Sequence, residues 1–533
     1  MITFEDVSIR YSPGSEPVLS QVNLTISEGE LAVVVGTTGC GKSTFLKSIN
    51  GLVPHFTGGI VSGQIRVNGR STADHHPRDL AETVGIVLQD PMSGFVADTV
   101  EDELAYSMEC LAIPPDVMRR RVEETLDLLG LHEARNRPLV NLSAGQKQRV
   151  AIGAALAAHP RVLVLDEPTS ALDPTAAEEV LAALHRLVHD LAITVVIAEH
   201  RLERVLQYAD VIVTIPGGGQ PVTLEEPREA MAHSVIAPAA VRLAREMHWS
   251  PLPMTVREAR RQATHLRSEE FVSAPRETTR SEAVSIDVQR VSAGYGRRIA
   301  VKDVSLRFHE GEITALMGRN GAGKTTLLHS LIGLVAPVSG SIRVRGKDPH
   351  GWSPKELISN VGYVPANPRD VLEFTTVSRE CETADELARL PQGTTSNLLC
   401  GWAPGIDPAS HPADLSEGQR LLLVLALVMA AQPPILILDE PTRGLDYPTK
   451  EVLIGHLQTL AQGGTTIVIA THDVELAAEL ADRVVVLAQG EVVTDGPTRD
   501  VVTSSPMFAP QIAKIMAPLS CITIADVHRV GAI

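Results

Sequence analysis

The chain alternates short, wholly apolar runs with longer segments of mixed polarity, and this series occurs twice. Each run is four or five residues long, which suits a strand buried on both faces, and the segments between the runs have helical spacing. The alternation predicts an α/β domain in each half, with a mostly parallel sheet covered by helices on both faces. The predicted buried strands are 32–35, 162–165 and 194–198 in the first half and 313–317, 435–438 and 466–470 in the second.

Two smaller subdomains accompany this predicted sheet. Helical spacing over 99–130, between the first two buried strands, predicts a helical subdomain, and the charged run 119–124 within it is interpreted as a solvated helix face. Apolar runs ahead of the first buried strand of each half predict an antiparallel β subdomain. These runs are 2–9 with 22–26 and 286–291 with 304–308.

The two halves share one layout, because matching motifs recur at nearly constant separation. The separations are 282 residues for Lys42 and Lys324, 273 for Asp166 and Asp439, and 272 for His200 and His472. The second half has therefore lost nine or ten residues net between its first and later motifs.

Each half also ends in a short C-terminal appendage, since 234–257 parallels 505–525. The appendage is either a helical cap on its own domain or a contact surface between the halves. The segment 267–282 is polar and almost free of aliphatic residues, which is typical of an exposed linker that keeps two domains at high effective concentration. We predict domain 1 at 1–262 (core about 1–235), a linker at 263–284, and domain 2 at 285–533 (core about 285–503).

The strongest motif is a glycine-rich loop between a predicted buried strand and a helix. It reads GTTGCGKST at 36–44 and GRNGAGKTT at 318–326, so both copies match G-x-x-x-x-G-K-[ST]. Glycine lets backbone N–H groups approach phosphate oxygens, the lysine contacts the β- and γ-phosphates, and the next hydroxyl binds Mg²⁺. The predicted ATP-binding residues are Gly36, Gly39, Gly41, Lys42, Ser43, Thr44, Gly318, Asn320, Gly321, Gly323, Lys324, Thr325 and Thr326, with Ser43 and Thr325 as Mg²⁺ ligands.

A pair of carboxylates ends the second buried strand of each half. Adjacent strand residues point to opposite faces, so the two acids of a pair have different tasks. We predict that Asp166 and Asp439 hold Mg²⁺ through water. The following acids, Glu167 and Glu440, are predicted to orient or deprotonate the water that attacks the γ-phosphate.

Two further features complete the candidate chemistry. A histidine follows the third buried strand of each half, and a lone histidine there is most often structural. At matching positions in both halves, His200 and His472 are instead predicted to contact the γ-phosphate and fix the attacking water. A Ser-x-Gly-Gln segment opens the helix before each carboxylate strand, which is either a plain helix N-cap or an anion site. Its residues are Ser143, Gly145 and Gln146, and Ser416, Gly418 and Gln419.

Composition narrows the function classes. The formal net charge of −17 and a pI near 5.5 argue against a nucleic-acid partner, which usually requires a basic face. The five cysteines include no C-x-x-C pair, so neither a disulfide framework nor a zinc site is predicted, and a reducing cytosol fits best. The most apolar stretch, 421–431, is eleven residues long, too short to cross a bilayer. We therefore expect membrane contact through partners only.

In their order, these motifs resemble the ATPase domains of ABC transporters, in both halves. The resemblance implies two P-loop domains in tandem that pair head to tail within the chain. Each ATP would then lie between the glycine-rich loop of one half and the Ser-x-Gly-Gln segment of the other. It also implies that Tyr11 and Tyr295 stack on adenine, and that Gln89 links Mg²⁺ and the attacking water to a membrane partner.

The second half departs from the family pattern. Ala366 stands where the first half has Gln89. In the family the residue after the serine of the Ser-x-Gly-Gln segment is a glycine, and here it is Glu417. We therefore predict two unequal sites. The site built on Lys42, closed by Ser416 and Gly418, keeps every polar group, whereas the site built on Lys324, closed by Ser143 and Gly145, lacks the glutamine.

A finer resemblance points to energy-coupling-factor (ECF) importers of vitamins and metals. The segments 52–59 and 89–103 are similar to those proteins, and 414–416 with 439–447 resemble the second half of their fused versions. This implies a transmembrane T component, a substrate-binding S component, and a peripheral position at the cytoplasmic face of the membrane. The cargo would be a vitamin, a vitamin precursor or a metal ion, and no residue identifies which.

Three alternatives stay open to different degrees. A tandem ATPase of a sugar importer is the nearest, because it too has unequal halves. A translation factor acting on the ribosome would carry a long, basic, helical connector, which the short mixed-charge segment 267–282 does not provide. A DNA-repair ATPase would need a long coiled coil, and no sustained heptads occur.

Overall fold

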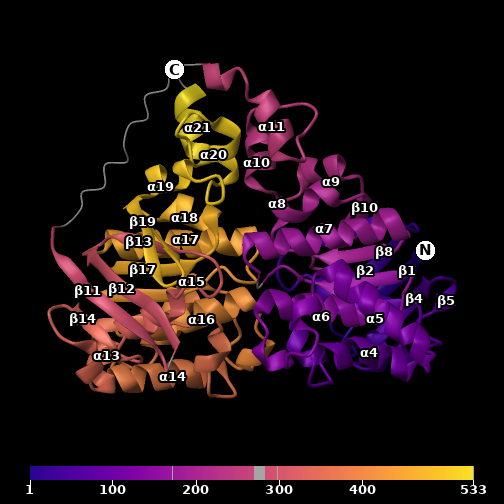
Figure 1. Ribbon diagram of the computed structural model, residues 1–533, viewed down its shortest axis with the longest axis horizontal. Coiled ribbons are helices and arrows are strands. Elements are labelled where there is room, and N and C mark those ends of the chain that lie inside the picture. The colour runs from indigo at the N-terminus through magenta and orange to yellow at the C-terminus, as the bar shows by residue number, and fades with distance from the viewer. Residues whose placement is uncertain (171, 269–281, 297, 532–533) are drawn as a thin grey trace. The chain divides into compact units, whose positions relative to one another are not determined.

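The six predicted buried strands form the centres of two separate sheets. In the computed structural model, which describes residues 1–170, 172–268, 282–296 and 298–531, the chain divides into the units Met1–Thr255 and Val256–Ile533 (Figure 1). Each unit holds a six-stranded, mostly parallel sheet and a smaller antiparallel sheet. The predicted architecture of two α/β domains in tandem is thus confirmed.

The large sheet of the first unit is parallel except for one edge strand. Its order is β10 (Thr223–Glu225), β9 (Val211–Thr214), β3 (Leu31–Val35), β8 (Thr194–Ala198), β7 (Val162–Asp166) and β6 (Val84–Val87), with β10 antiparallel. Every residue of β3, β7 and β8 is buried. Because alternate side chains of a strand point to opposite faces, the sheet is covered on both sides, as predicted.

The predicted antiparallel pair lies in the second sheet of this unit. That sheet has the order β2 (Leu19–Ile26), β1 (Ile2–Arg10), β4 (Ile60–Val67) and β5 (Arg70–Ser71). Phe4 on β1 stacks on Phe45 of α1 (Lys42–Ile49) with the ring centroids 4.7 Å apart. Both rings belong to one apolar core with alternate residues of β3, β7 and β8. The helix that follows the glycine-rich loop is therefore packed between the two sheets.

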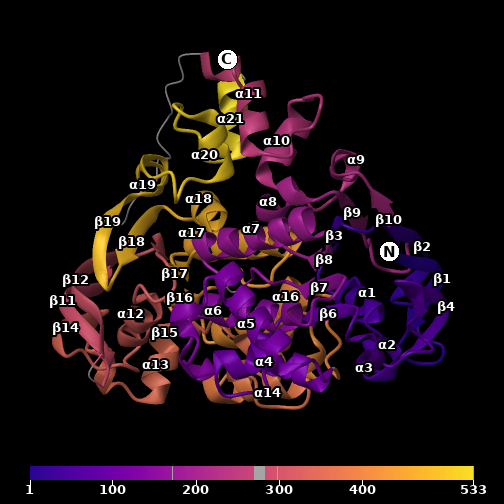
Figure 2. The ribbon, with the colours of Figure 1, turned by 45° about the vertical axis from the view of Figure 1, so that its right-hand side comes forward.

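The predicted helical subdomain consists of three helices that pack on one another: α4 (Val100–Cys110), α5 (Pro115–Leu129) and α6 (Ala144–Ala157) (Figure 2). In the charged run 119–124, Arg119, Arg120 and Glu124 are exposed, whereas Val122 is buried, so the run forms a solvated face. The remaining helices of the unit are α2 (Leu52–His55), α3 (Pro77–Leu80), α7 (Pro174–Leu191), α8 (Leu202–Val205), α9 (Pro227–His233) and α10 (Ala239–Glu246).

The second unit repeats this plan. Its large sheet has the order β15 (Val361–Val364), β16 (Ile435–Asp439), β17 (Thr466–Thr471), β13 (Ile313–Met317), β18 (Arg483–Ala488) and β19 (Glu491–Pro497), with β19 antiparallel. Its small sheet has the order β12 (Arg298–His309), β11 (Val284–Tyr295) and β14 (Ser339–Val344). Alternate residues of β16 belong to different cores, Ile437 to one and Leu438 to the other, so this sheet too is buried on both faces.

The helices of the second unit follow the same sequence of positions. They are α12 (Lys324–Leu331), α13 (Pro354–Asn360), α14 (Val377–Ala388), α15 (Thr394–Trp402), α16 (Glu417–Met429), α17 (Tyr447–Gln462), α18 (Val474–Leu480), α19 (Thr498–Ser504), α20 (Gln511–Met516) and α21 (Ile524–Gly531). The apolar stretch 421–431 lies mainly in α16. Across the described ranges of the chain, no helix combines the length and the hydropathy that a bilayer crossing requires.

The appendages are helical, and one helix lies in a different unit from the domain that the sequence predicted for it. α11 (Val256–Gln262), which the sequence assigned to the first domain, belongs to the second unit and packs on α20. There Ala259 is buried, and Arg260 Nη1 donates to the carbonyl of Lys514 at 2.6 Å. The two units divide after Thr255, seven residues before the predicted boundary at 262, and the linker at 263–284 stays a prediction, since 269–281 lie outside the described residues.

Candidate active sites

Both glycine-rich loops follow a backbone path that requires glycine. Gly41 and Gly323, which precede α1 and α12, have φ angles of 111° and 104°, a region that favours glycine strongly. A Cβ atom on Gly36 would lie 2.4 Å from the carbonyl oxygen of Ile215. Neither helix has a side-chain cap, so the N–H groups of its first turn are left for a ligand.

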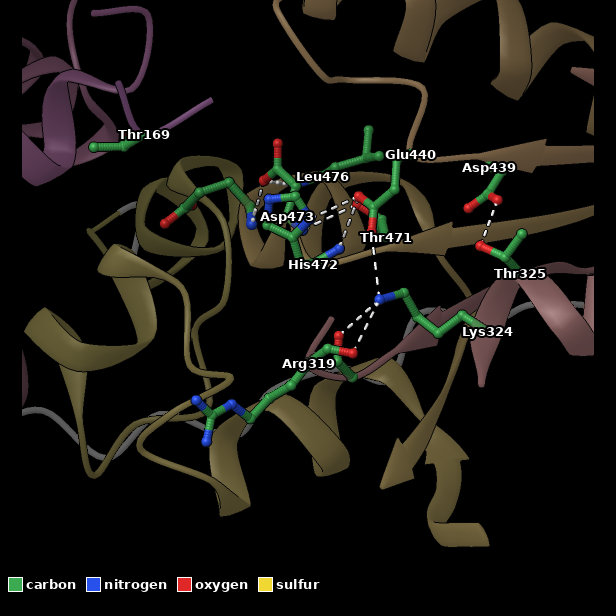
Figure 3. Close-up of polar contacts among 12 residues, drawn as sticks. Thr169, Arg319, Lys324, Thr325, Asp439, Glu440, Thr471, His472, Asp473 and Leu476 are labelled. Atoms are coloured by element: carbon green, nitrogen blue, oxygen red, sulfur yellow. Dashed lines mark hydrogen bonds and ion pairs between the residues drawn. The ribbon is translucent and has the colours of Figure 1, made fainter. Parts of the chain in front are cut away.

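The lysine of each loop is buried and folded back onto the loop. Lys42 Nζ donates to the carbonyls of Gly36 at 2.9 Å and Thr37 at 3.0 Å. Lys324 Nζ donates to Gly318 O at 2.8 Å and lies 3.4 Å from Glu440 Oε1 (Figure 3). A buried ammonium group needs such partners. The contacts hold its charge inside the loop, where a phosphate group would be bound.

Three predicted side chains of the first half meet at the carboxyl ends of the parallel strands. Gln89 Nε2 donates to Glu167 Oε2 at 3.2 Å, and His200 Nε2 lies 2.7 Å from Glu167 Oε1. Burial raises the pKa of Glu167, but His200, Lys42 and Gln89 outweigh it, so the pKa lies below its ordinary value. The carboxylate is therefore ionised at neutral pH, as a general base must be.

The backbone of this acid is strained in both halves. Glu167 has a φ of 51° and Glu440 a φ of 48°, which for a residue with a side chain costs about 1–3 kcal/mol. The strained turn is tied to the neighbouring strand, because Glu167 N donates to Ala198 O at 2.9 Å and Glu440 N to Ala470 O at 2.8 Å. Such strain is concentrated at functional sites.

The second half arranges its acid differently. His472 approaches Glu440 Oε2 through Nδ1, at 2.7 Å, and its backbone N–H donates to the same oxygen at 3.3 Å (Figure 3). Ala366 has no side-chain amide, and Lys324 Nζ lies 3.4 Å from Glu440 Oε1. The predicted departure from the family pattern therefore changes the hydrogen bonding of the acid itself.

The residues predicted to hold Mg²⁺ fit a hard cation with oxygen ligands. Thr325 Oγ1 donates to Asp439 Oδ2 at 2.7 Å (Figure 3), while Asp439 Oδ1 is buried without a hydrogen-bond partner among the described residues. Burial raises the pKa of Asp439 and of Asp166, which a bound cation would reverse. Among the described residues, no group of three or more His, Cys, Asp or Glu side chains is arranged to hold a metal ion by itself. Water and phosphate oxygens would complete the shell, as is usual for Mg²⁺.

The Ser-x-Gly-Gln segments form capping boxes. Ser143 Oγ accepts a hydrogen bond from Gln146 N at 3.2 Å, and Gln146 Oε1 accepts one from Ser143 N at 3.1 Å. Ser416 and Gln419 make the same pair at 3.2 and 3.0 Å. Ser143 and Ser416 therefore act as the N-caps of α6 and α16, which is the simpler of the two predicted roles. Anion binding by these residues stays a prediction.

The two predicted adenine-stacking tyrosines lie beside the helix that carries the lysine. Tyr11 OH is 3.0 Å from Thr44 Oγ1 on α1, and Tyr295 OH is 2.9 Å from His329 Nδ1 on α12. Their exposed fractions are 47% and 55%, so both side chains are accessible to a ligand. Stacking on adenine stays a prediction.

Sequence reasoning missed a buried acid beside the histidine of the first half. Glu199 Oε1 accepts a hydrogen bond from Thr169 N at 2.9 Å, and Oε2 accepts from His200 N at 3.1 Å. Glu199 thereby joins the turn after β7 to the turn after β8. The sequence shows that Glu199 is next to His200, but it does not show that Glu199 contacts Thr169, which lies 30 residues earlier. In the second half the same place is occupied by Thr471, and Lys450 instead pairs with Asp473 at 2.9 Å.

Comparison with known proteins gives concordant results. The family model described as ABC transporter matches residues 19–170 and 301–443. A Streptomyces avermitilis protein named as an ABC transporter ATP-binding protein is 54% identical over 99% of this chain and 100% of its own length. A Methanosarcina acetivorans protein of the same name is 32% identical over 94% of this chain and 85% of its own length.

Solved structures support the fold alone. An archaeal ribosome recycling factor, aABCE1, in complex with the ribosomal stalk protein aP1, has a TM-score of 0.61 at 21% identity, over 94% of this chain and 91% of that chain. A structure named RNase-L Inhibitor has a TM-score of 0.60 at 21% identity, over 94% and 92%.

Proposed function

This chain belongs to the ATP-binding proteins of ABC transporters, and we propose that it is the ATPase subunit that powers an importer of the ECF type. Its reaction is the hydrolysis of ATP to ADP and phosphate. The proposed cargo is a small solute: a vitamin, a vitamin precursor or a metal ion. Two observations together support the proposal. The first half holds the lysine, glutamine, acid and histidine expected for hydrolysis, and the second unit has an exposed apolar groove.

The proposed hydrolysis uses the ionised acid of the first half as its base. Glu167 takes a proton from the water that attacks the γ-phosphate, and His200, 2.7 Å away, holds the carboxylate in place. Lys42 and the N–H groups of α1 balance the charge that develops on the transferred phosphoryl group. Mg²⁺, held by Ser43 and Asp166, would supply further charge neutralisation.

We propose that the second half binds ATP but hydrolyses it less. In that half Ala366 stands at the position of Gln89, and Glu440 contacts His472 Nδ1 at 2.7 Å and Lys324 Nζ at 3.4 Å. Closure of each site by the Ser-x-Gly-Gln segment of the other half remains part of the proposal. So does the holding of Mg²⁺ by Thr325 and Asp439.

The groove supports a membrane partner. It is a cavity of about 420 Å³ between β15, α14 and α16, lined mainly by apolar side chains. Leu334 and Leu387 on its wall are 62% and 64% exposed, and exposed apolar residues gathered in one groove mark an interaction site. We propose that a short amphipathic helix from a cytoplasmic loop of the T component binds here, its basic residue facing Glu373 on the wall.

The first-half segment 89–103, which resembles ECF proteins, is built around a buried acid, and the corresponding loop of the second half has the same arrangement. Glu103 Oε2 accepts hydrogen bonds from the N–H groups of Val96 at 2.9 Å and Ala97 at 2.8 Å. Glu380 Oε1 accepts from Glu373 and Phe374, both at 2.7 Å. The loop that leads into the helical subdomain therefore has a defined shape, which a docking surface requires. The proposed site of action is the cytoplasmic face of the membrane, reached through the T and S components.

Co-purification from membranes tests the proposal. The tagged chain, extracted in mild detergent, is expected to retain a multi-span membrane protein, and Leu387→Asp is expected to release it. The matched control is Leu191→Asp, which changes a residue of similar exposure, 61%, in the first unit. Retention by both variants would contradict the groove assignment. Co-sedimentation of the chain with ribosomes in ATP, without any membrane protein, would instead favour a translation factor.

A further inference from the structure

Three side chains of the second unit form a hydrogen-bonded row. Tyr295 OH lies 2.9 Å from His329 Nδ1, and His329 Nε2 lies 3.1 Å from Tyr363 OH. The rings of His329 and Tyr363 meet edge to face, with centroids 5.7 Å apart. The row runs from the end of β11, across α12, to β15.

The two ends of this row lie at two different candidate sites. Tyr295 is the predicted adenine-stacking residue, and Tyr363 lines the apolar groove. Tyr363 also stands three residues before Ala366, the position that lacks the glutamine. The row therefore joins the nucleotide end of this half to the surface proposed for the membrane partner.

The first half has no such row. The residues at the positions of His329 and Tyr363 are Lys47 and Ile86, and Tyr11 OH pairs with Thr44 instead. What the first half does have is Gln89, bonded to the catalytic acid. Each half thus contains one connection that the other lacks.

A neutral histidine makes the row a two-state element. Burial lowers the pKa of His329 and raises that of Tyr363, so at neutral pH the imidazole is uncharged and the phenol is protonated. A neutral imidazole has one donor and one acceptor nitrogen. If Tyr295 donates to Nδ1, then Nε2 donates to Tyr363; if Tyr295 accepts from Nδ1, then Tyr363 donates to Nε2. A change at one end therefore reverses the bond at the other.

We propose that the row Tyr295–His329–Tyr363 conveys base occupancy of the second nucleotide site to the groove, in place of the glutamine connection that this half lacks. A base stacked on Tyr295 would fix that ring and select one arrangement of the row. In one arrangement the Tyr363 hydroxyl donates its proton to His329; in the other it accepts from His329, and its proton is free to donate to a partner bound in the groove. His329 is a positioning residue in this scheme. The inference rests on the proposed function for the roles of Tyr295 and of the groove.

Hydrogen exchange of the full chain tests it. Exchange of groove segments 357–364 and 371–388 is measured with no ligand, with saturating Mg·ADP, and with Mg·pyrophosphate, which has phosphates but no base. We expect Mg·ADP to slow exchange in these segments by about threefold or more, a change of local opening free energy of about 0.7 kcal/mol, and pyrophosphate to leave it unchanged. The effect should be lost in His329→Phe, because a phenyl ring has neither a donor nor an acceptor nitrogen, and in Tyr363→Phe. Tyr106→Phe in the first unit is the control for loss of a phenol.

The possible results distinguish a failure of the proposed row from a failure of the proposed function. Mg·ADP binding is first measured by calorimetry for every variant, and a wild-type chain that binds no Mg·ADP refutes the ATPase role itself. Binding without any change in the groove refutes the row alone. So does an equal response to pyrophosphate, or a response that both variants retain. Failure of a membrane protein to co-purify leaves the row standing and refutes the transporter role.

Discussion

Replacing the two candidate bases one at a time tests the inequality of the sites. Glu167→Gln keeps the size of the side chain but removes the charge that His200 and Gln89 contact at 2.7 and 3.2 Å. Loss of a general base lowers rate by about 10²–10⁴, and Lys42 and the loop amides are unaffected by the change. We therefore expect ATP turnover to fall about 10³-fold, which corresponds to about 4 kcal/mol.

The matched change in the second half should cost far less. Ala366 stands where the first half has Gln89, and the proposed function therefore assigns the second site a small share of the total turnover. We expect a loss of less than about threefold, since the intact first site continues to supply general-base catalysis. Phosphate release in the steady state is the assay, with nucleotide binding measured in parallel. Equal losses in the two variants would refute the reasoning.

Three smaller predictions follow from particular contacts. Gly418→Ala would place a Cβ 2.5 Å from Thr449 Cγ2, whereas the same change at Gly145 leaves 3.3 Å to its neighbour, so urea unfolding should show a loss of about 1–3 kcal/mol for the former and less for the latter. Glu199→Ala removes the acceptor of four hydrogen bonds and should lower unfolding free energy by about 2 kcal/mol or more. The pKa of Glu167 in the folded chain is lowered. The ionised carboxylate therefore stabilises the fold at pH values above the pKa that Glu167 has in the unfolded chain, and this contribution is lost as the pH falls through its pKa in the folded chain. A pH–rate profile should show no acid limb from this group between about pH 6 and 8.

The sheets could be predicted from the sequence because a strand buried on both faces needs a short apolar run with clear ends. The runs 194–198 and 313–317 match β8 and β13 residue for residue. The contact of Gln89, Glu167 and His200 could also be anticipated, because all three follow parallel strands whose carboxyl ends meet at one edge.

Other features depend on contacts that no local pattern encodes. α11 joins the second unit through its packing on α20, far along the chain, so spacing placed it in the first domain. His329 looks like an ordinary helix residue until Tyr295 and Tyr363, each 34 residues away, are found on either side of it. The amide of Gln146, in contrast, returns to its own cap, as the spacing of Ser143 and Gln146 in the motif allows.

The most direct measurement counts nucleotides on the purified chain by native mass spectrometry in Mg²⁺ and a non-hydrolysable ATP analogue. Two glycine-rich loops with buried lysines predict two nucleotides per chain, and Lys42→Ala and Lys324→Ala should each reduce the count to one. A single nucleotide on the wild-type chain, or a count that neither substitution changes, would contradict the account.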